Sequence, residues 1–350
     1  MGSAGPSESV VRIAWWAGIL CLSLSAALVL QVLQMRWRLA RRKRRREAVL
    51  TAWRPVLFEV IAGGSPRLPP VAPDEEDAFL LLWLHLLDSI RGAPVEALAA
   101  AGEAVGARAF ARRRLRGADA LGRMLALRTL GYLRNPADEA EVLRRLDDPN
   151  AYLSLSAAHA LVHLDPAGSP DEILPRLASR ADWPIPLFTG LLQEMHPARL
   201  SARFRALCSE LPPLGLARVL SLASFVEAPV VEEITGRLLG REQDPEVLAE
   251  ALRHVRSPAL LPAVRLAAVH ERWAVRVQAA AALGRVGEPS DRELLLEMMW
   301  DREWWVRYRA AQALAAGAVA APEDLVARAA QLRDRFALDM LQQALAEVRA

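Results

Sequence analysis

The sequence is poor in several kinds of residue, and each shortage excludes a class of protein. It has two cysteines, Cys21 and Cys208, too few for a disulfide scaffold or a four-ligand zinc site. Aromatic residues make up only 6% of the 350 positions, and β-branched residues are also sparse, which argues against an all-β fold. Charged residues reach 24% while apolar residues reach 53%, so the chain is not disordered. The length suits two domains or one extended array.

Positive charge is concentrated in one short segment. The pI of 9.3 is typical of nucleic-acid binding, but residues 36–46 alone carry eight of the cations. The whole chain carries +3, and Glu8 cancels Arg12, so residues 47–350 carry a net charge of −5. A nucleic-acid interface needs its cations spread over a folded face. We therefore expect no nucleic acid among the partners.

Residues 13–33 form an uncharged, apolar run of 21 residues. At about 1.5 Å per residue, a helix of this length spans the ~30 Å hydrocarbon core of a bilayer. Tryptophans flank the run, and the cations follow it. The positive-inside rule therefore predicts a transmembrane helix with residues 1–12 outside and the remainder in the cytoplasm. The alternative, a cleavable signal peptide, would carry its cations before the apolar stretch.

Residues 34–46 form a basic juxtamembrane segment after the predicted transmembrane helix. Its cations set the topology, and each basic residue near the surface also attracts anionic lipid by about 1 kcal/mol. The two roles are compatible. The residues assigned to lipid contact and topology are Arg41, Arg42, Lys43, Arg44, Arg45 and Arg46.

A helical linker region is expected over residues 47–114. Residues 47–62 have helical apolar spacing, and the proline-rich residues 63–73 break regular structure. The acidic residues 74–77 suit the first turn of a helix.

Two further helices are expected before the remainder of the chain. Residues 78–91 are apolar on all sides, so this helix must be buried. Residues 95–116 read as one more helical stretch.

A leucine recurs every 30 or 31 residues through the rest of the chain. Alanines lie four and three positions before several of these leucines, and they leave a bare stripe on which a second helix packs closely. Short connections containing Gly or Pro join the helices, so each repeat is a hairpin that buries its apolar face only by stacking. The recurring leucines are Leu130, Leu161, Leu192, Leu222, Leu252, Leu283, Leu314 and Leu345.

One copy of the repeat carries a clear family resemblance. Residues 301–314 read Asp-Arg-Glu-Trp-Trp-Val-Arg-Tyr-Arg-Ala-Ala-Gln-Ala-Leu, and residues 273–284 repeat the pattern. The pattern resembles HEAT repeats, and it is most similar to the short kind shared with phycobilisome bilin lyases. The resemblance covers residues 115–350, although the copies near residues 175–240 are degenerate. It implies an all-α protein in which an N-terminal transmembrane helix precedes a right-handed α-solenoid of HEAT-like helical hairpins.

The resemblance also implies roles for two arginines. Arg276 and Arg307 match a structural arginine of HEAT-like repeats, which pairs with an acid of its own or the adjacent repeat. Residues 148–161 match the general pattern of the repeat, but Ser154 stands at the position of the arginine. Asp148 and Asp301 stand where a helix needs an N-terminal cap.

Candidate catalytic groups have ordinary structural interpretations. His159 and His163 are spaced for a metal, but the glutamate of a zinc protease helix is missing and both are expected to face solvent. Cys208, on an apolar helix, is expected in the core rather than as a nucleophile. We predict no catalytic residue, no metal site and no cofactor, and hence no enzymatic activity.

The densest aromatic group of the array is the best candidate for a partner surface. Trp304 and Tyr308 lie one helical turn apart and about opposite Val306, so they form an exposed stripe unless a neighbouring repeat covers them. Trp, Tyr and Arg are common anchors of protein interfaces. The predicted partner-binding residues are Trp304, Trp305, Tyr308 and Arg309.

These features predict a non-enzymatic scaffold or accessory subunit on a single-pass anchor. The GC-rich composition and the resemblance to short HEAT repeats suggest a bacterial cell, so we expect the membrane to be the bacterial inner membrane. The family suggests a protein partner such as a membrane glycosyltransferase or another envelope complex. Two alternatives stay open, a bilin-lyase-like enzyme and a regulator that senses a ligand or lipid.

Overall fold

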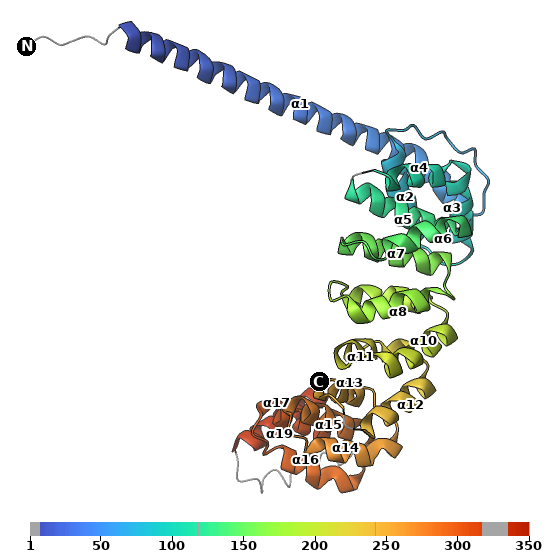
Figure 1. The fold of residues 1–350 in the computed structure, drawn as a ribbon, viewed down its shortest axis with the longest axis vertical. Helices are drawn as coiled ribbons and strands as arrows, with labels where there is room; N and C mark the ends of the chain where they lie inside the picture. Colours follow the sequence, from blue (N-terminus) through green and yellow to red (C-terminus); the bar gives the residue numbers. More distant parts are fainter. Residues whose placement is uncertain (1–7, 118, 242, 317–334, 350) are drawn as a thin grey trace, which may run out of the picture. The chain divides into compact units, whose positions relative to one another are not determined.

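A computed structural model describes residues 8–117, 119–241, 243–316 and 335–349 (Figure 1). Every regular element in these ranges is a helix, which confirms the all-α fold class. The chain divides into two compact units, residues 1–138 and 139–350. The predicted domain boundaries themselves stay predictions.

Unit 1 begins with one continuous helix of 54 residues, α1 (Glu8–Ile61). It contains the apolar run, the basic segment and the following amphipathic stretch, which were predicted as three separate segments. Its segment Trp15–Trp37 has a mean hydropathy of 2.1, and none of it is buried against the rest of the protein. This helix is therefore long and apolar enough to cross a membrane.

The last turns of α1 belong to the core of unit 1. Trp53 packs against Phe79 of the second helix with ring centroids 4.6 Å apart. The indole of Trp83 donates a hydrogen bond to the Leu98 carbonyl at 2.7 Å. A Cβ on Gly102 would come within 2.4 Å of the Trp83 ring, so only glycine allows this packing. The further helices of unit 1 are α2 (Glu76–Ser89), α3 (Ala93–Ala104), α4 (Ala107–Leu115) and α5 (Ala120–Leu133), followed by the 3₁₀ turn η1 (Pro136–Asp138).

Two sequence expectations about unit 1 meet different outcomes. The all-apolar helix is buried as predicted, with Phe79, Leu80 and Trp83 fully enclosed. The single helix predicted over residues 95–116 is wrong, because Gly106 adopts a left-handed φ of 85° and separates α3 from α4.

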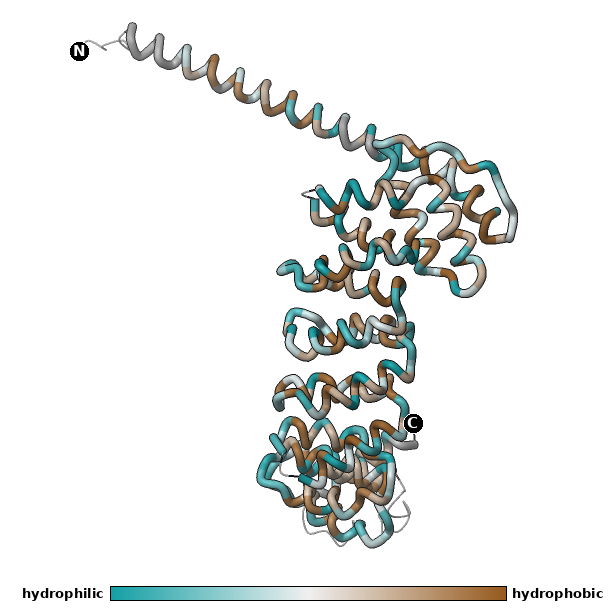
Figure 2. Tube along the Cα trace, turned by 45° about the vertical axis from the view of Figure 1, so that its right-hand side comes forward, coloured by the Kyte–Doolittle hydropathy of each residue, from teal (hydrophilic) through white to brown (hydrophobic). Residues whose placement is uncertain are grey.

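Unit 2 is a succession of helical hairpins, in which hydrophobic residues recur from helix to helix (Figure 2). The second helices of the C-terminal hairpins, α13, α15, α17 and α19, contact one another in order, and α12, α14 and α16 pair with them. The elements are α6 (Glu139–Arg145), α7 (Ala151–Leu164), α8 (Ser169–Ser179), η2 (Ile185–Phe188), α9 (Thr189–Glu194), α10 (Pro197–Glu210), α11 (Pro213–Leu220), η3 (Ala223–Phe225), α12 (Ala228–Leu239), α13 (Pro245–Arg253), η4 (Pro258–Leu260), α14 (Leu261–Ala268), α15 (Trp273–Val286), η5 (Pro289–Asp291), α16 (Arg292–Met298), α17 (Trp304–Ala315) and α19 (Arg335–Arg349).

The predicted period agrees with the buried face of these helices. All eight recurring leucines are buried, including Leu130 in α5 of unit 1, and the most accessible is Leu345 at 6%. The small residues before them let neighbouring helices approach closely. A Cβ on Gly284 of α15 would lie 2.9 Å from the Cα of Ala313 on α17.

Candidate partner surface and membrane-proximal site

The aromatic patch, defined here as Trp304, Trp305 and Tyr308, begins helix α17. This helix buries Val306 and Ala310, so the aromatic side chains are directed away from the core. The rings of Trp304 and Tyr308 are stacked with centroids 5.1 Å apart and planes 9° apart. The rings of Trp304 and Trp305 are nearly perpendicular, with centroids 4.8 Å apart. Trp304 is 46% exposed and Trp305 57%, so the patch presents apolar surface to solvent.

Polar contacts with α19 hold one side of the patch. The Tyr308 hydroxyl donates to Oε2 of Glu347 at 3.1 Å, and the Gln312 amide donates to the same oxygen at 3.3 Å. Arg309 donates to Gln312 at 3.0 Å and is itself exposed. Tyr308 is thus fixed by a neighbouring helix while the two tryptophans stay open. The partner-binding role of these four residues stays a prediction.

The basic residues of α1 whose side chains the structure describes are exposed, but they are not equivalent. Arg45 forms an ion pair with Asp74, and Lys43 lies 3.9 Å from Glu47. The Arg41 guanidinium lies over the Trp37 ring, 5.3 Å from its centroid. The side chain of Arg42 is outside the described part of the chain.

The acidic run 74–77 does more than begin a helix. Glu76 and Asp77 lie in the first turn of α2, as the sequence predicted. Glu76 also pairs with Arg113 of α4 at 2.5 Å, and Asp77 pairs with Arg114 at 3.0 Å. The sequence showed the acids but not their partners, because α4 approaches α2 only in the folded unit.

A cavity of about 730 Å³ lies among α1, the start of α2 and the end of α4. Four arginines and three acids face it, together with apolar side chains. Its lining residues are Trp37, Arg41, Arg45, Arg46, Val49, Asp74, Glu75, Asp77, Ala78, Leu81 and Arg114.

Arg276 joins two successive repeats in unit 2. Its guanidinium donates to both carboxylate oxygens of Asp301 at 2.6 and 2.8 Å. It also donates to the carbonyls of His270 and Glu271 at 2.8 and 2.9 Å. The structural role inferred for Arg276 is confirmed. Within the described residues Arg307 differs, because its guanidinium donates to the Asp301 carbonyl at 3.2 Å.

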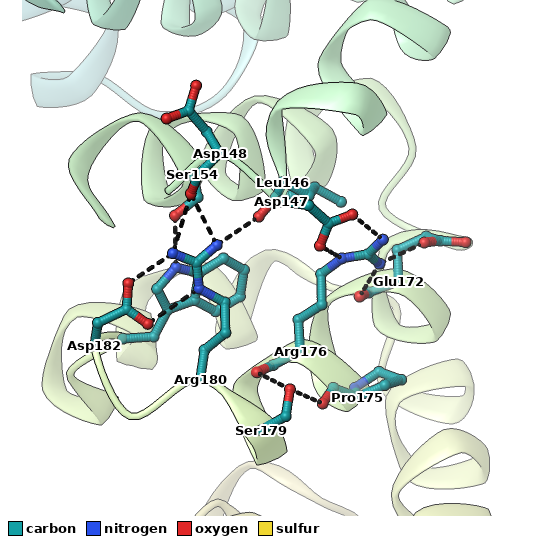
Figure 3. A network of polar contacts seen from close by, with 11 residues as sticks. Leu146, Asp147, Asp148, Ser154, Glu172, Pro175, Arg176, Ser179, Arg180 and Asp182 are labelled. Atoms are coloured by element: carbon teal, nitrogen blue, oxygen red, sulfur yellow. Dashed lines mark hydrogen bonds and ion pairs between the residues drawn. The ribbon is translucent and has the colours of Figure 1, made fainter. Parts of the chain in front are cut away.

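The earlier repeat reaches a similar arrangement with a different arginine (Figure 3). Ser154 accepts a hydrogen bond from the Trp183 indole at 2.8 Å. Arg180 donates to the carbonyls of Leu146 and Asp148 at 3.0 and 3.1 Å. Its guanidinium also binds the Asp182 carboxylate at 2.6 Å. Arg180 therefore does here what Arg276 does in the later repeat.

The capping role expected of two aspartates is wrong by two residues. Asn150 caps α7, and its side chain accepts from Tyr152 N at 3.0 Å. Asp148 instead accepts from Asn150 N, and Asp301 from Glu303 N, both at 2.9 Å. Each aspartate therefore stabilises the turn before the helix rather than the helix itself.

The histidine pair is also placed differently from the prediction. The rings of His163 and His159 lie 4.6 Å apart, but His163 is only 7% exposed and its Nδ1 lies 3.4 Å from Glu194. Contacts of α7 with α6, α8 and α9 explain this, because the neighbouring repeat covers the face opposite Leu161.

Cys208 is buried, as expected. Burial raises the pKa of its thiol to about 12, although the charge of Arg237 acts in the opposite direction. The thiol is therefore protonated at neutral pH, and a protonated thiol is a poor nucleophile.

Comparison with known proteins bears on this repeated architecture. Residues 236–315 match the family of HEAT repeats. This match supports the prediction of HEAT repeats for that segment of the chain. The matched segment includes Arg276, Asp301 and the aromatic patch. The finer likeness of these HEAT repeats to those of bilin lyases stays a prediction.

Solved structures similar to the chain include importin beta crystallised in an ammonium sulfate condition. That alignment has 12% identity and a TM-score of 0.26, and covers 84% of this chain and 54% of importin beta. The chain thus spans about half the length of that protein. No curated protein matches the chain in sequence.

Proposed function

We propose that this protein is a non-enzymatic scaffold or accessory subunit, anchored in a membrane by α1, whose HEAT repeats bind a protein partner. The observation that carries the proposal is the aromatic patch. Two half-exposed tryptophans and a tyrosine fixed by Glu347 form a pre-ordered apolar surface on a rigid helix. Such a surface binds with little loss of side-chain entropy.

The membrane part of the proposal is supported by α1. Its exposed apolar segment has the length of a bilayer core, and cations follow it directly. This order favours an N-terminus outside and HEAT repeats in the cytoplasm, at the inner membrane of a bacterium. Anchoring raises the local concentration of the HEAT repeats, so modest affinity for a membrane partner suffices. A membrane glycosyltransferase or another envelope complex is the partner class we favour.

Affinity purification of the full chain from membranes in mild detergent tests the partner surface. We expect a stoichiometric protein partner with the native chain and its loss with Trp304→Ala plus Tyr308→Ala. Truncating anchor residues of an interface costs about 2 kcal/mol or more each, so the pair should weaken binding by about 700-fold or more. Quantitative mass spectrometry of the co-purified proteins measures this ratio.

Tyr152→Ala is the matched control, because Tyr152 is an exposed aromatic residue, 69% accessible, in the first turn of α7. It should leave the partner bound. Retention of the partner by the double variant would remove the patch from the proposal. If no protein co-purifies even after cross-linking, the scaffold role itself fails.

Alkaline carbonate extraction tests the anchor independently of any partner. We expect the native chain to stay with the membrane pellet and a chain lacking residues 1–37 to become extractable. Release of the native chain would contradict membrane anchoring.

A further inference from the structure

We propose that the cavity among α1, α2 and α4 binds the headgroup of a singly charged anionic phospholipid through its phosphodiester. The inference rests on the membrane anchoring proposed above. It replaces a diffuse attraction by the whole basic segment with a site of defined residues.

One end of the cavity lies at the depth of lipid headgroups. Trp37 ends the apolar segment of α1 and is also a lining residue of the cavity. A helix rises about 1.5 Å per residue, so along a helix normal to the membrane Arg41 lies about 6 Å and Arg45 about 12 Å beyond Trp37. The headgroup layer on each side of a bilayer is roughly 5–8 Å thick. The cavity therefore begins where the phosphate groups are.

The arginines of the lining divide into two kinds. Arg45 is paired with Asp74, and Arg114 with Asp77. These ion pairs join α1 and α4 to the start of α2 and hold the walls together. Within the described residues, Arg41 and Arg46 form no ion pair with a carboxylate. The Arg41 guanidinium lies over the Trp37 ring, which leaves its N–H groups available to an anion. Guanidinium groups bind phosphate oxygens through paired, charge-assisted hydrogen bonds.

The remaining lining residues restrict the ligand. Glu75 also faces the cavity, where its negative charge opposes a second charge on the ligand. A phosphodiester with one charge is therefore favoured over a phosphomonoester with two. Val49 and Leu81 supply apolar wall, and the volume of about 730 Å³ lies within the range of small-molecule sites.

Lipid binding to the purified full chain, followed by native mass spectrometry, tests the site. The probes are phosphatidylglycerol, phosphatidylcholine and inorganic phosphate, added to protein in mild detergent. The variant is Arg41→Gln plus Arg46→Gln, and the matched control is Lys43→Gln plus Arg44→Gln. Both pairs remove two positive charges from the same exposed segment, but only the first pair lines the cavity.

We expect the native chain to bind phosphatidylglycerol in preference to phosphatidylcholine. The cavity variant should weaken phosphatidylglycerol binding about 25-fold, at about fivefold for the charge-assisted hydrogen bonds of each arginine, and the control variant less than about twofold. Phosphatidic acid, which carries a phosphomonoester, should bind more weakly than phosphatidylglycerol.

Equal losses in the two variants would overturn the proposal, because they would show attraction by the segment as a whole. Equal binding of phosphatidylcholine would overturn it as well. Displacement of phosphatidylglycerol by inorganic phosphate would identify a site for the free ion instead of a lipid. Carbonate extraction separates these results from failure of the proposed function, since a chain that stays in the membrane but lacks lipid preference loses only the cavity site.

Discussion

The junctions of Arg276 and Arg180 satisfy the same positions of the HEAT-like repeat by different means. His270 and Asp148 each stand thirteen residues before a recurring leucine, and each offers its carbonyl to a guanidinium. In the later repeat Arg276 comes from the helix that follows these carbonyls. In the earlier repeat Arg180 directly follows α8, the second helix after the carbonyls. The two repeats thus share the backbone carbonyls that accept the hydrogen bonds, whereas the arginine that donates to them comes from a different place in each repeat.

The two junctions differ most in burial. The side chains of Arg276 and Asp301 are 9% and 12% exposed. Those of Arg180 and Asp182 are 17% and 45% exposed. Because an unpaired charge costs more in a dry environment, the later junction should be the more sensitive to substitution.

The largest effect is expected from Arg276→Ala. It removes the guanidinium from two carbonyls and from the Asp301 carboxylate, which keeps only the Glu303 N–H as a donor, and this should destabilise this part of the array by about 3–5 kcal/mol. Hydrogen exchange of the α15 backbone amides in the detergent-solubilised full chain measures the free energy of local opening.

Arg272→Ala is the control for this variant, because Arg272 is exposed at the start of the same helix. It should change protection of α15 little. If Arg276→Ala opens α15 no more than the control does, the Asp301 pair is not what joins these repeats.

Arg180→Ala should have a smaller effect, of about 1–3 kcal/mol, in the exchange of α7 and α8. The carbonyls of Leu146 and Asp148 lose a donor, but Asp182 is exposed enough to be solvated by water. Arg199→Ala on α10 provides an exposed control. An effect as large as that of Arg276→Ala would show that burial does not separate the two junctions.

The features that sequence predicted well are those set by periodicity within one helix. The leucine period identified the buried face because residues three and four apart share a side of a helix. The apolar helix that became α2 was identified as buried for the same reason. The partner of Arg276 was anticipated in kind, as an acid of its own or the adjacent repeat, because the repeat carries it as part of a pattern.

Features built from several helices could not be predicted in this way. The substitution of Arg180 for the missing arginine depends on a turn outside the repeated pattern, and on Trp183 donating to Ser154. His163 is buried because a neighbouring repeat covers it, which no periodicity within α7 reveals. The cavity requires α4 beside α2, and no pattern within either helix predicts that approach.

The smallest effect on stability is expected from lowering the pH, and this effect should also differ between the Arg276–Asp301 and Arg180–Asp182 pairs. Burial acts to raise the pKa of Asp301, but hydrogen bonds from Arg276 and the Glu303 N–H, with the arginine's charge, lower it further than burial raises it. A carboxyl with a lowered folded pKa stabilises the fold above its unfolded pKa of about 3.9, and this stability is lost as the pH falls through the folded value. The urea midpoint of the full chain should therefore fall as the pH decreases below about 4, and Asp301→Asn should flatten that decrease.

The pKa of Asp182 is also lowered, by its hydrogen bond from Arg180, but this carboxylate is exposed to solvent that screens the pair. Asp182→Asn should consequently leave the acid dependence nearly unchanged, and an equal flattening by both variants would mean that the exposed pair stabilises the array as much as the buried one.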